Sequence, residues 1–187
     1  MKYLHLGRKL ICSNSLFDVH FDHLIKGENE VKDFLTIKPK KHIGKDKVVG
    51  ICVLPMIEKK FALMEGWRHQ FDKYIWQAPA GFVEENEDPY ETAIRELREE
   101  TGLICNKSNL ISLGKFIPDA GLVEGKVALY LATDCIQSDV KIIDEVGMGK
   151  LHFFSSKELL QLITQNSNIG GSTLTLSFRA IEFLKKK

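Results

Sequence analysis

The sequence predicts an α/β protein, because stretches with strand patterning and stretches with helical patterning alternate along its 187 residues. The run VVGICVLP at 48–55 is continuously apolar, which is typical of a strand buried on both faces of a sheet. Residues 88–102 carry apolar side chains at helical spacing between a start and a stop signal. Residues 1–47 alternate between polar and apolar in short segments, which favours half-buried strands. We therefore expect a small N-terminal β subdomain at 1–47 and an α/β domain at 48–187.

Two strands are expected in the N-terminal part, at 16–21 and 33–37, where apolar side chains recur with a period of two. The segment 26–29, KGEN, has the composition of a turn between two strands. The run KPKKH at 38–42 is charged and contains a proline, so we expect a connector to the second part of the chain.

The helix at 88–102 has recognisable ends. Asp88 is a good N-cap residue and Pro89 suits the first helical position. Glu91 stands three residues after Asp88, which predicts a capping box. Gly102 can adopt the left-handed conformation that ends such a helix.

The other elements of the α/β domain follow from the same patterns. Ser155 and Glu158 predict a capping box at the start of a helix at 157–164, and a last amphipathic helix is expected at 174–184. The further strands expected are 61–65, 110–117, 127–132 and 151–154.

The composition limits the function. The 44% hydrophobic content is enough to bury a core in one domain. The 26 basic and 25 acidic residues nearly balance, which argues against binding to nucleic acid or to an anionic membrane. The chain has no apolar run long enough to span a membrane and no signal-peptide pattern at its start. Four cysteines without a C-x-x-C pair read as reduced thiols, so we expect a cytoplasmic protein.

Three glutamates share one side of the helix at 88–102. Glu96, Glu99 and Glu100 stand at i, i+3 and i+4, where like charges repel by about a few tenths of a kcal/mol per pair. They also lie near the helix C-terminus, where the helix dipole disfavours anions. A bound cation accounts for this cost, and oxygen-only ligands suit Mg²⁺, with Mn²⁺ as a substitute.

The segment from Gly81 to Leu103 resembles the Nudix box, because it reads G-x5-E-x7-R-E-L-x-E-E-x-G-L without a departure. The resemblance implies a Nudix hydrolase with an α/β/α sandwich around a mixed β-sheet. It also implies that divalent cations activate water against a diphosphate. The defined positions are Gly81, Glu87, Arg95, Glu96, Leu97, Glu99, Glu100, Gly102 and Leu103.

Carried over by position, the resemblance implies a metal site made by Glu96 and Glu100 together with the carbonyl of Ala80. Glu99 would be a further ligand or would hold the reacting water, which makes it a catalytic residue as well. Arg95 would orient the glutamates through its guanidinium group, and Glu87 would support it.

The resemblance also implies that a carboxylate in the loop at 139–150 serves as general base or as a metal ligand. Glu145 is the residue we predict for this role, and Asp144 is the alternative.

Features around the box resemble the branch of the family that acts on ADP-ribose and related ADP-sugars. Pro118 stands sixteen residues after Gly102, as the marker proline of that branch does. Arg68 is a candidate for a substrate phosphate or for a structural salt bridge, and Glu124 for a substrate contact or a plain surface charge. Gln77 occupies a substrate-side position where the branch usually has glutamate, which removes one negative charge there.

The predicted reaction is Mg²⁺-dependent hydrolysis of a nucleoside diphosphate sugar, ADP-ribose above all, to AMP and ribose 5-phosphate. An aromatic shelf for the base is expected from Phe17, Phe21 or Trp67, each of which can instead belong to the core. The alternatives are another Nudix substrate, such as a nucleoside triphosphate, or a catalytically silent ligand-binding module. The partner is a small nucleotide sugar, with no nucleic acid and no membrane, and the branch implies a homodimer formed through residues 1–47.

Overall fold

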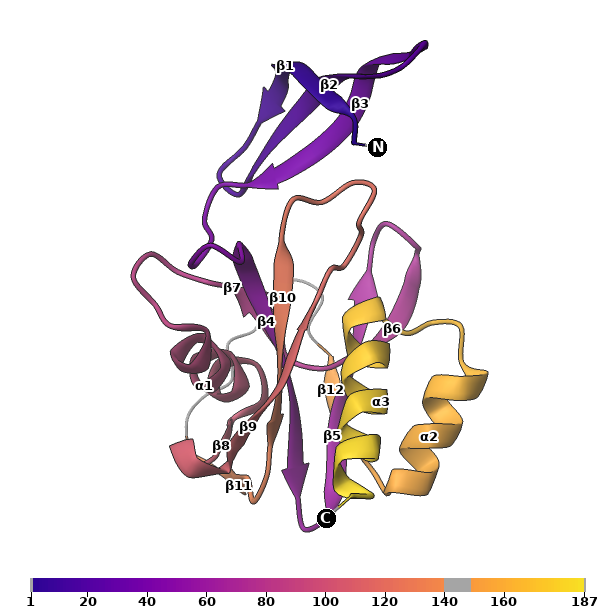
Figure 1. Cartoon of the computed structure of the whole chain (residues 1–187). Helices are drawn as coiled ribbons and strands as arrows, with labels where there is room; N and C mark the ends of the chain where they lie inside the picture. Colours follow the sequence, from indigo (N-terminus) through magenta and orange to yellow (C-terminus); the bar gives the residue numbers. More distant parts are fainter. Residues whose placement is uncertain (1, 140–148, 187) are drawn as a thin grey trace.

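The computed structural model describes residues 2–139 and 149–186. Its main part is a mixed seven-stranded sheet with the strand order β12-β5-β4-β10-β9, in which β6 pairs with β5 and β7 with β4 (Figure 1). β4 and β10 are parallel, and the other pairs are antiparallel. The strands are β4 (Val48–Ile57), β5 (Lys60–Arg68), β6 (Lys73–Gln77), β7 (Ala80–Phe82), β9 (Leu110–Phe116), β10 (Lys126–Ala132) and β12 (Lys150–Phe154).

Helices cover both faces of this sheet. α1 (Pro89–Thr101) packs on one face, and α2 (Ser156–Gln165) and α3 (Gly171–Leu184) pack on the other (Figure 1). The continuous apolar run of β4 makes this possible, because Ile51 and Val53 face the α1 layer while Cys52 and Leu54 face α2 and α3. The predicted α/β/α sandwich with a mixed sheet is confirmed.

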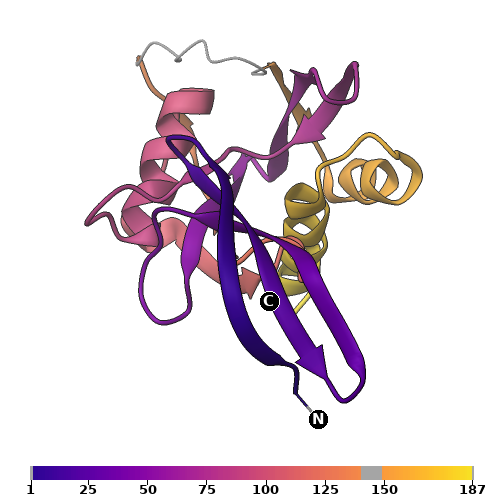
Figure 2. The same ribbon diagram turned by 90° about the horizontal axis from the view of Figure 1, so that it is seen from above.

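A separate three-stranded antiparallel sheet precedes this body, with the order β1-β2-β3. It consists of β1 (Leu4–Ser13), β2 (Phe17–Lys26) and β3 (Asn29–Pro39). It lies beyond one end of the main sheet and crosses over the body when seen from above (Figures 1 and 2). The two sheets are joined at Ile37, whose N–H donates to the Leu122 carbonyl at 2.8 Å and whose carbonyl accepts from the Glu124 N–H at 2.9 Å.

The predicted elements agree with the structure except at a few places. β1 was not predicted, because register shifts after His5 and after Leu10 interrupt its alternation. The two-stranded ladder of β8 (Leu103–Ile104) and β11 (Ile136–Gln137) was also missed, as were the short strands β6 and β7. No helix in the two described ranges is long and apolar enough to span a membrane.

Candidate active site

α1 begins and ends where the sequence predicts. The Asp88 side chain accepts a hydrogen bond from the Tyr90 N–H, and Gly102 caps the C-terminus with φ 68°. The capping box predicted at the N-terminus of α1, between Asp88 and Glu91, is wrong, because the Glu91 side chain pairs with Lys107 instead. The capping box of α2, between Ser155 and Glu158, is confirmed. These caps fix the frame that carries the glutamates of α1.

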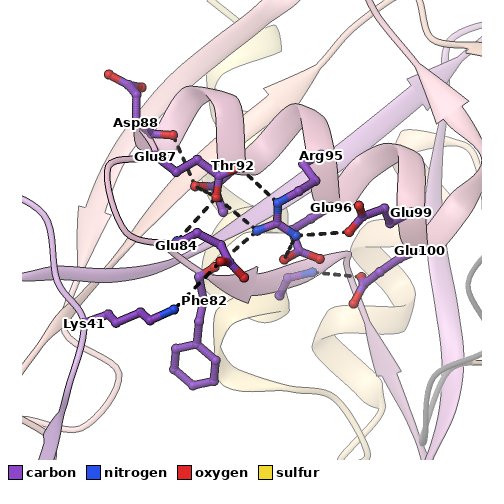
Figure 3. A network of polar contacts seen from close by, with 11 residues as sticks. Lys41, Phe82, Glu84, Glu87, Asp88, Thr92, Arg95, Glu96, Glu99 and Glu100 are labelled. Atoms are coloured by element: carbon purple, nitrogen blue, oxygen red, sulfur yellow. Dashed lines mark hydrogen bonds and ion pairs between the residues drawn. The ribbon is translucent and has the colours of Figure 1, made fainter. Parts of the chain in front are cut away.

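Arg95 is the centre of a polar network on the exposed side of α1 (Figure 3). Its Nε donates to Glu87 Oε1 at 3.0 Å and its Nη2 donates to Glu87 Oε2 at 3.1 Å, a two-pronged pairing. The hydrogen bonds from Arg95 hold the pKa of the Glu87 carboxyl below its usual value. Thr92 also donates to Glu87 Oε2 at 2.9 Å. Glu87 therefore anchors the guanidinium, as the resemblance implied for it.

The third nitrogen of Arg95 faces the other glutamates. Nη1 donates to Glu96 Oε1 at 2.7 Å and to Glu99 Oε2 at 3.1 Å. The Glu96 side chain is only 12% exposed. Negative charge on the cluster raises the pKa of Arg95 above its ordinary value, the hydrogen bond to Glu87 contributing most. Arg95 thus offsets part of the repulsion between these carboxylates.

Strand β7 brings the backbone close to the same carboxylates. The Ala80 N–H donates to Glu100 Oε2 at 3.0 Å. A side chain added at Gly81 would overlap the Glu96 carboxylate, so a larger residue here would displace Glu96. Beneath it, a Cβ added at Gly50 would come within 2.7 Å of the Gly81 carbonyl oxygen. The structure therefore places Glu96 and Glu100 beside β7, and Arg95 links Glu96 to Glu99.

The donor set of this cluster fits a hard divalent cation. Glu96, Glu99 and Glu100 offer carboxylate oxygens, and the backbone of Ala80 lies next to Glu100. Two of these carboxylates turn toward Arg95 and the third toward the Ala80 N–H. Within the described ranges, no three His, Cys, Asp or Glu side chains converge into a ready-made metal site.

A cavity of about 550 Å³ opens beside Glu100 and Ala80. Arg68 and Gln77 line it as well, and the Arg68 guanidinium donates to Gln77 Oε1. At this position the related pyrophosphatases usually have glutamate. Because this chain has glutamine there, Arg68 contacts a neutral amide oxygen in place of a carboxylate. Two of the predicted metal residues, Ala80 and Glu100, thus line the same cavity as two of the predicted substrate residues, Arg68 and Gln77.

Sequence reasoning missed the apolar wall of this cavity, which includes Phe71 and Ile75. Phe71 is 66% exposed although it is a large aromatic residue. It lies in the tight connection between β5 and β6, at 69–72. A large hydrophobic residue in a tight turn is unusual, and this feature of the sequence could have indicated that Phe71 lines a binding site.

The structure does not bring Glu124 to this cavity. Glu124 lines a different hollow of about 410 Å³, between the N-terminal sheet and the loop at 117–126. There it accepts from Arg8 Nη1 at 2.8 Å and pairs with Lys47. Both Glu145 and Asp144, the predicted alternatives for the general base, lie outside the described residues.

The three aromatic candidates for a base shelf lie in contacts of their own. Phe17 packs edge-to-face on Phe82, with ring centroids 5.4 Å apart, and Trp67 packs in the same way on Tyr74 at 5.3 Å. Phe21 lies half-buried within β2. None of these three residues is among those that line the 550 Å³ cavity.

The fold and the cluster can be compared with known proteins. The NUDIX domain model matches residues 46–170, which include α1 and its glutamates. The chain belongs to the Nudix family. The enzyme class predicted from the sequence, a Nudix pyrophosphatase, is confirmed, as is the resemblance to the ADP-ribose and ADP-sugar pyrophosphatases.

Relatives of this Nudix protein include the methanol dehydrogenase activator of Bacillus methanolicus, 41% identical over 147 residues, covering 78% of this chain and 74% of the relative. The ADP-ribose pyrophosphatase of Bacillus subtilis (strain 168) is 27% identical over 185 residues, covering 97% and 92%. Among solved structures, an ADP compounds hydrolase superposes with a TM-score of 0.80 at 17% identity, over 100% of this chain and 96% of the other. That structural likeness shows a shared fold.

Proposed function

We propose that the protein hydrolyses the pyrophosphate bond of ADP-ribose in the presence of Mg²⁺, giving AMP and ribose 5-phosphate. The proposal rests on one observation: Glu100, one of the α1 carboxylates, lines the same cavity as the cationic side chain of Arg68. Glu100 and Ala80 border both the carboxylate cluster and the cavity that Arg68 lines. A diphosphate placed there would have the Arg68 guanidinium on one side and the cation held by the carboxylates on the other, and both would offset its negative charge.

In this proposal Glu96, Glu99, Glu100 and the Ala80 carbonyl hold Mg²⁺, which Mn²⁺ can replace. A bound divalent cation neutralises phosphate charge and lowers the pKa of a water molecule. Arg95 keeps Glu96 and Glu99 oriented by donating to both from one nitrogen.

The remaining steps are assigned to residues around the cavity. Arg68 contacts a phosphate, and Gln77 orients Arg68 through their hydrogen bond. Glu145 takes the proton from water, with Asp144 as the alternative. Glu124 is retained as a substrate contact only for a conformation in which it leaves Arg8 and Lys47, because both cations hold it at the N-terminal sheet.

The choice of ADP-ribose is supported by the relative from Bacillus subtilis, which aligns with almost the entire chain under the name ADP-ribose pyrophosphatase. The apolar wall formed by Phe71 and Ile75 gives the cavity a surface on which a base or ribose can pack.

The proposal includes a homodimer formed through residues 1–47, with 48–187 as the hydrolase domain. β1 is an edge strand whose ten residues are all exposed. Its apolar side chains include Leu4, 66% exposed, and Leu10, 55% exposed. An unpaired apolar edge is a ready template for another strand. Sedimentation velocity tests this: a dimer that Leu10→Lys dissociates supports it, and a monomer at all concentrations contradicts it.

A cytoplasmic location is part of the proposal, because all four cysteines are free thiols, which is typical of a reducing compartment. Fractionation of cells that express the tagged protein tests it.

Chromatographic product analysis tests the reaction. The purified protein is incubated with Mg²⁺ and, separately, with ADP-ribose, other ADP-sugars and nucleoside triphosphates. Release of AMP and ribose 5-phosphate from ADP-ribose supports the proposal. Cleavage of triphosphates alone would replace the substrate with another Nudix substrate, and no cleavage with Mg²⁺ or Mn²⁺ would favour the silent binding module.

A second candidate function comes from the relative named methanol dehydrogenase activator, which is 41% identical to this chain. In that role the protein would raise the rate of a dehydrogenase. The rate of methanol dehydrogenase with and without the protein tests this, and Glu100→Gln separates activation that needs hydrolysis from activation by binding alone.

A further inference from the structure

Two cysteines face each other at the end of the small β8–β11 ladder. In this antiparallel pair Ile104 stands opposite Ile136, and Leu103 stands opposite Gln137. Continuing the register by one residue on each strand brings Cys105 opposite Cys135. Directly opposite Cα atoms in an antiparallel pair are about 4.5–5.5 Å apart, inside the range of about 4.4–6.8 Å that disulfides span.

The two thiols differ in accessibility. Cys135 is 2% exposed and belongs to the apolar cluster under α1, where its Sγ donates to the Ala132 carbonyl at 3.3 Å. Its N–H donates to the Met56 carbonyl at 2.9 Å, which fixes it at the end of β4. Cys105 packs against the same cluster but is only partly buried. An external reagent therefore reaches Cys105 first.

We propose that Cys105 and Cys135 are a site of reversible oxidation, at which a low-molecular-weight disulfide converts the two thiols into an intramolecular disulfide. The Cys105 thiolate attacks one sulfur of the reagent, forms a mixed disulfide and releases one thiolate. The Cys135 thiol then loses its proton and attacks Cys105 Sγ, which releases the second thiolate. The two protein thiols are oxidised, the reagent is reduced to two thiols, and the two protons pass to the released thiolates.

The contact between the thiols supports this order of attack. The hydrogen bond with Cys135 lowers the pKa of the Cys105 thiol. The same contact, together with burial, raises the pKa of Cys135. The thiolate is the reactive form, so Cys105 is the attacking group and Cys135 the resolving one.

The bond would join two parts of the molecule that the ladder already holds together. The Gly102 carbonyl, at the C-cap of α1, accepts from the Ser138 N–H at 2.9 Å. A disulfide three residues after this cap would fix the end of α1 to the segment that leaves β10. Because it closes the chain between 105 and 135, it would restrict the unfolded state and raise the melting temperature, by on the order of 5 °C.

The test uses the full-length protein with Cys12→Ser, because Cys12 is exposed and would react by itself, whereas Cys52 is buried within the sheet. The native protein is treated with oxidised glutathione and then analysed by mass spectrometry and peptide mapping. We expect the loss of two hydrogen atoms, a peptide linking Cys105 to Cys135, a higher melting temperature, and reversal by dithiothreitol.

Two matched variants resolve the steps. Cys135→Ala is expected to stop at a glutathione adduct on Cys105, and Cys105→Ala is expected to leave Cys135 unmodified. Circular dichroism melts confirm that each variant is folded before treatment. A stable glutathione adduct on Cys105 while Cys135 is present would overturn the proposal, as would two unreacted thiols in the folded protein.

Discussion

The α/β body and the N-terminal sheet are built on opposite principles. In the body, apolar side chains fill two layers, and Val53, Leu54, Leu63 and Leu97 are completely buried. In β1, β2 and β3, which the structure describes in full, only Asp22, Thr36 and Pro39 are buried. The N-terminal sheet has no apolar core of its own.

A polar network takes the place of that core. Asp22, 5% exposed, accepts from Arg8 Nε at 2.6 Å and Nη2 at 2.9 Å, from Thr36 Oγ1 at 2.7 Å, and pairs with His5 Nε2 at 3.1 Å. Arg8 then continues the network to Glu124 in the body. The body therefore folds on hydrophobic burial, whereas the N-terminal sheet depends on ionic contacts and on surfaces outside itself.

The largest expected difference is between one leucine of each part. Leu97→Ala removes a fully buried side chain of α1 and should lower the free energy of unfolding by about 2–5 kcal/mol. Leu6→Ala, at a position that is 54% exposed in β1, should cost less than about 0.5 kcal/mol in the monomer. Urea unfolding measures both. Equal costs would show that the two parts are not built differently.

An intermediate effect is expected at the polar network. Asp22→Asn removes the charge that Arg8 pairs with, and should weaken the N-terminal sheet by about 1–2 kcal/mol, since Arg8 is partly exposed to solvent. Hydrogen exchange of the β2 amides measures this locally. Unchanged exchange in β2 would mean that the network does not hold the sheet.

The same residue predicts a pH dependence. Arg8 is the main cause that holds the pKa of Asp22 well below its usual value. A depressed pKa stabilises the folded state above the unfolded-state value of about 3.9. The stabilisation should therefore be complete at neutral pH and be lost as the pH falls below about 4. In Asp22→Asn this acid-dependent loss of β2 protection should be smaller than in the wild type, and the part that remains comes from Asp18 and Glu30, whose pKa values are also lowered by their partners.

The smallest effect concerns the aromatic contact between the two parts. Phe17 of β2 packs edge-to-face on Phe82 of β7 at an interplanar angle of 76°. Phe17→Leu should weaken the docking of the sheet by about 0.5–1.5 kcal/mol. Phe34→Leu is the matched control, because Phe34 is 41% exposed in β3. If the two changes affected hydrogen exchange of the β2 amides equally, Phe17 would not contribute to docking through its contact with Phe82.

The sequence predicted the body well because its elements follow local rules. The run of β4, the caps at Asp88 and Gly102, and the Ser155 capping box each leave a short-range pattern. The box also placed Arg95 among its glutamates, since their spacing on a helix fixes which side chains meet.

Other features depend on contacts between distant segments, which no local pattern records. β1 was missed because its irregular register hides the alternation. The pairing of Glu124 with Arg8 joins positions 116 residues apart, and Phe71 reaches the cavity only because β5 and β6 fold back together. The role of the predicted aromatic residues could not be read from the sequence for the same reason. Phe17 packs on Phe82 and Trp67 on Tyr74, and these contacts form only when the chain folds.

The proposed hydrolysis requires a divalent cation held by the repelling carboxylates of α1. The most direct measurement is the rate of AMP release from ADP-ribose against Mg²⁺ concentration for three proteins: the wild type, Glu100→Gln and Glu91→Gln. Glu91 is the matched control, because it lies on the same helix but pairs with Lys107. We predict that Glu100→Gln lowers the rate at least about 100-fold, while Glu91→Gln matches the wild type. A Glu100→Gln rate close to wild type, or wild-type turnover that persists in EDTA, would show that these carboxylates do not hold a required cation.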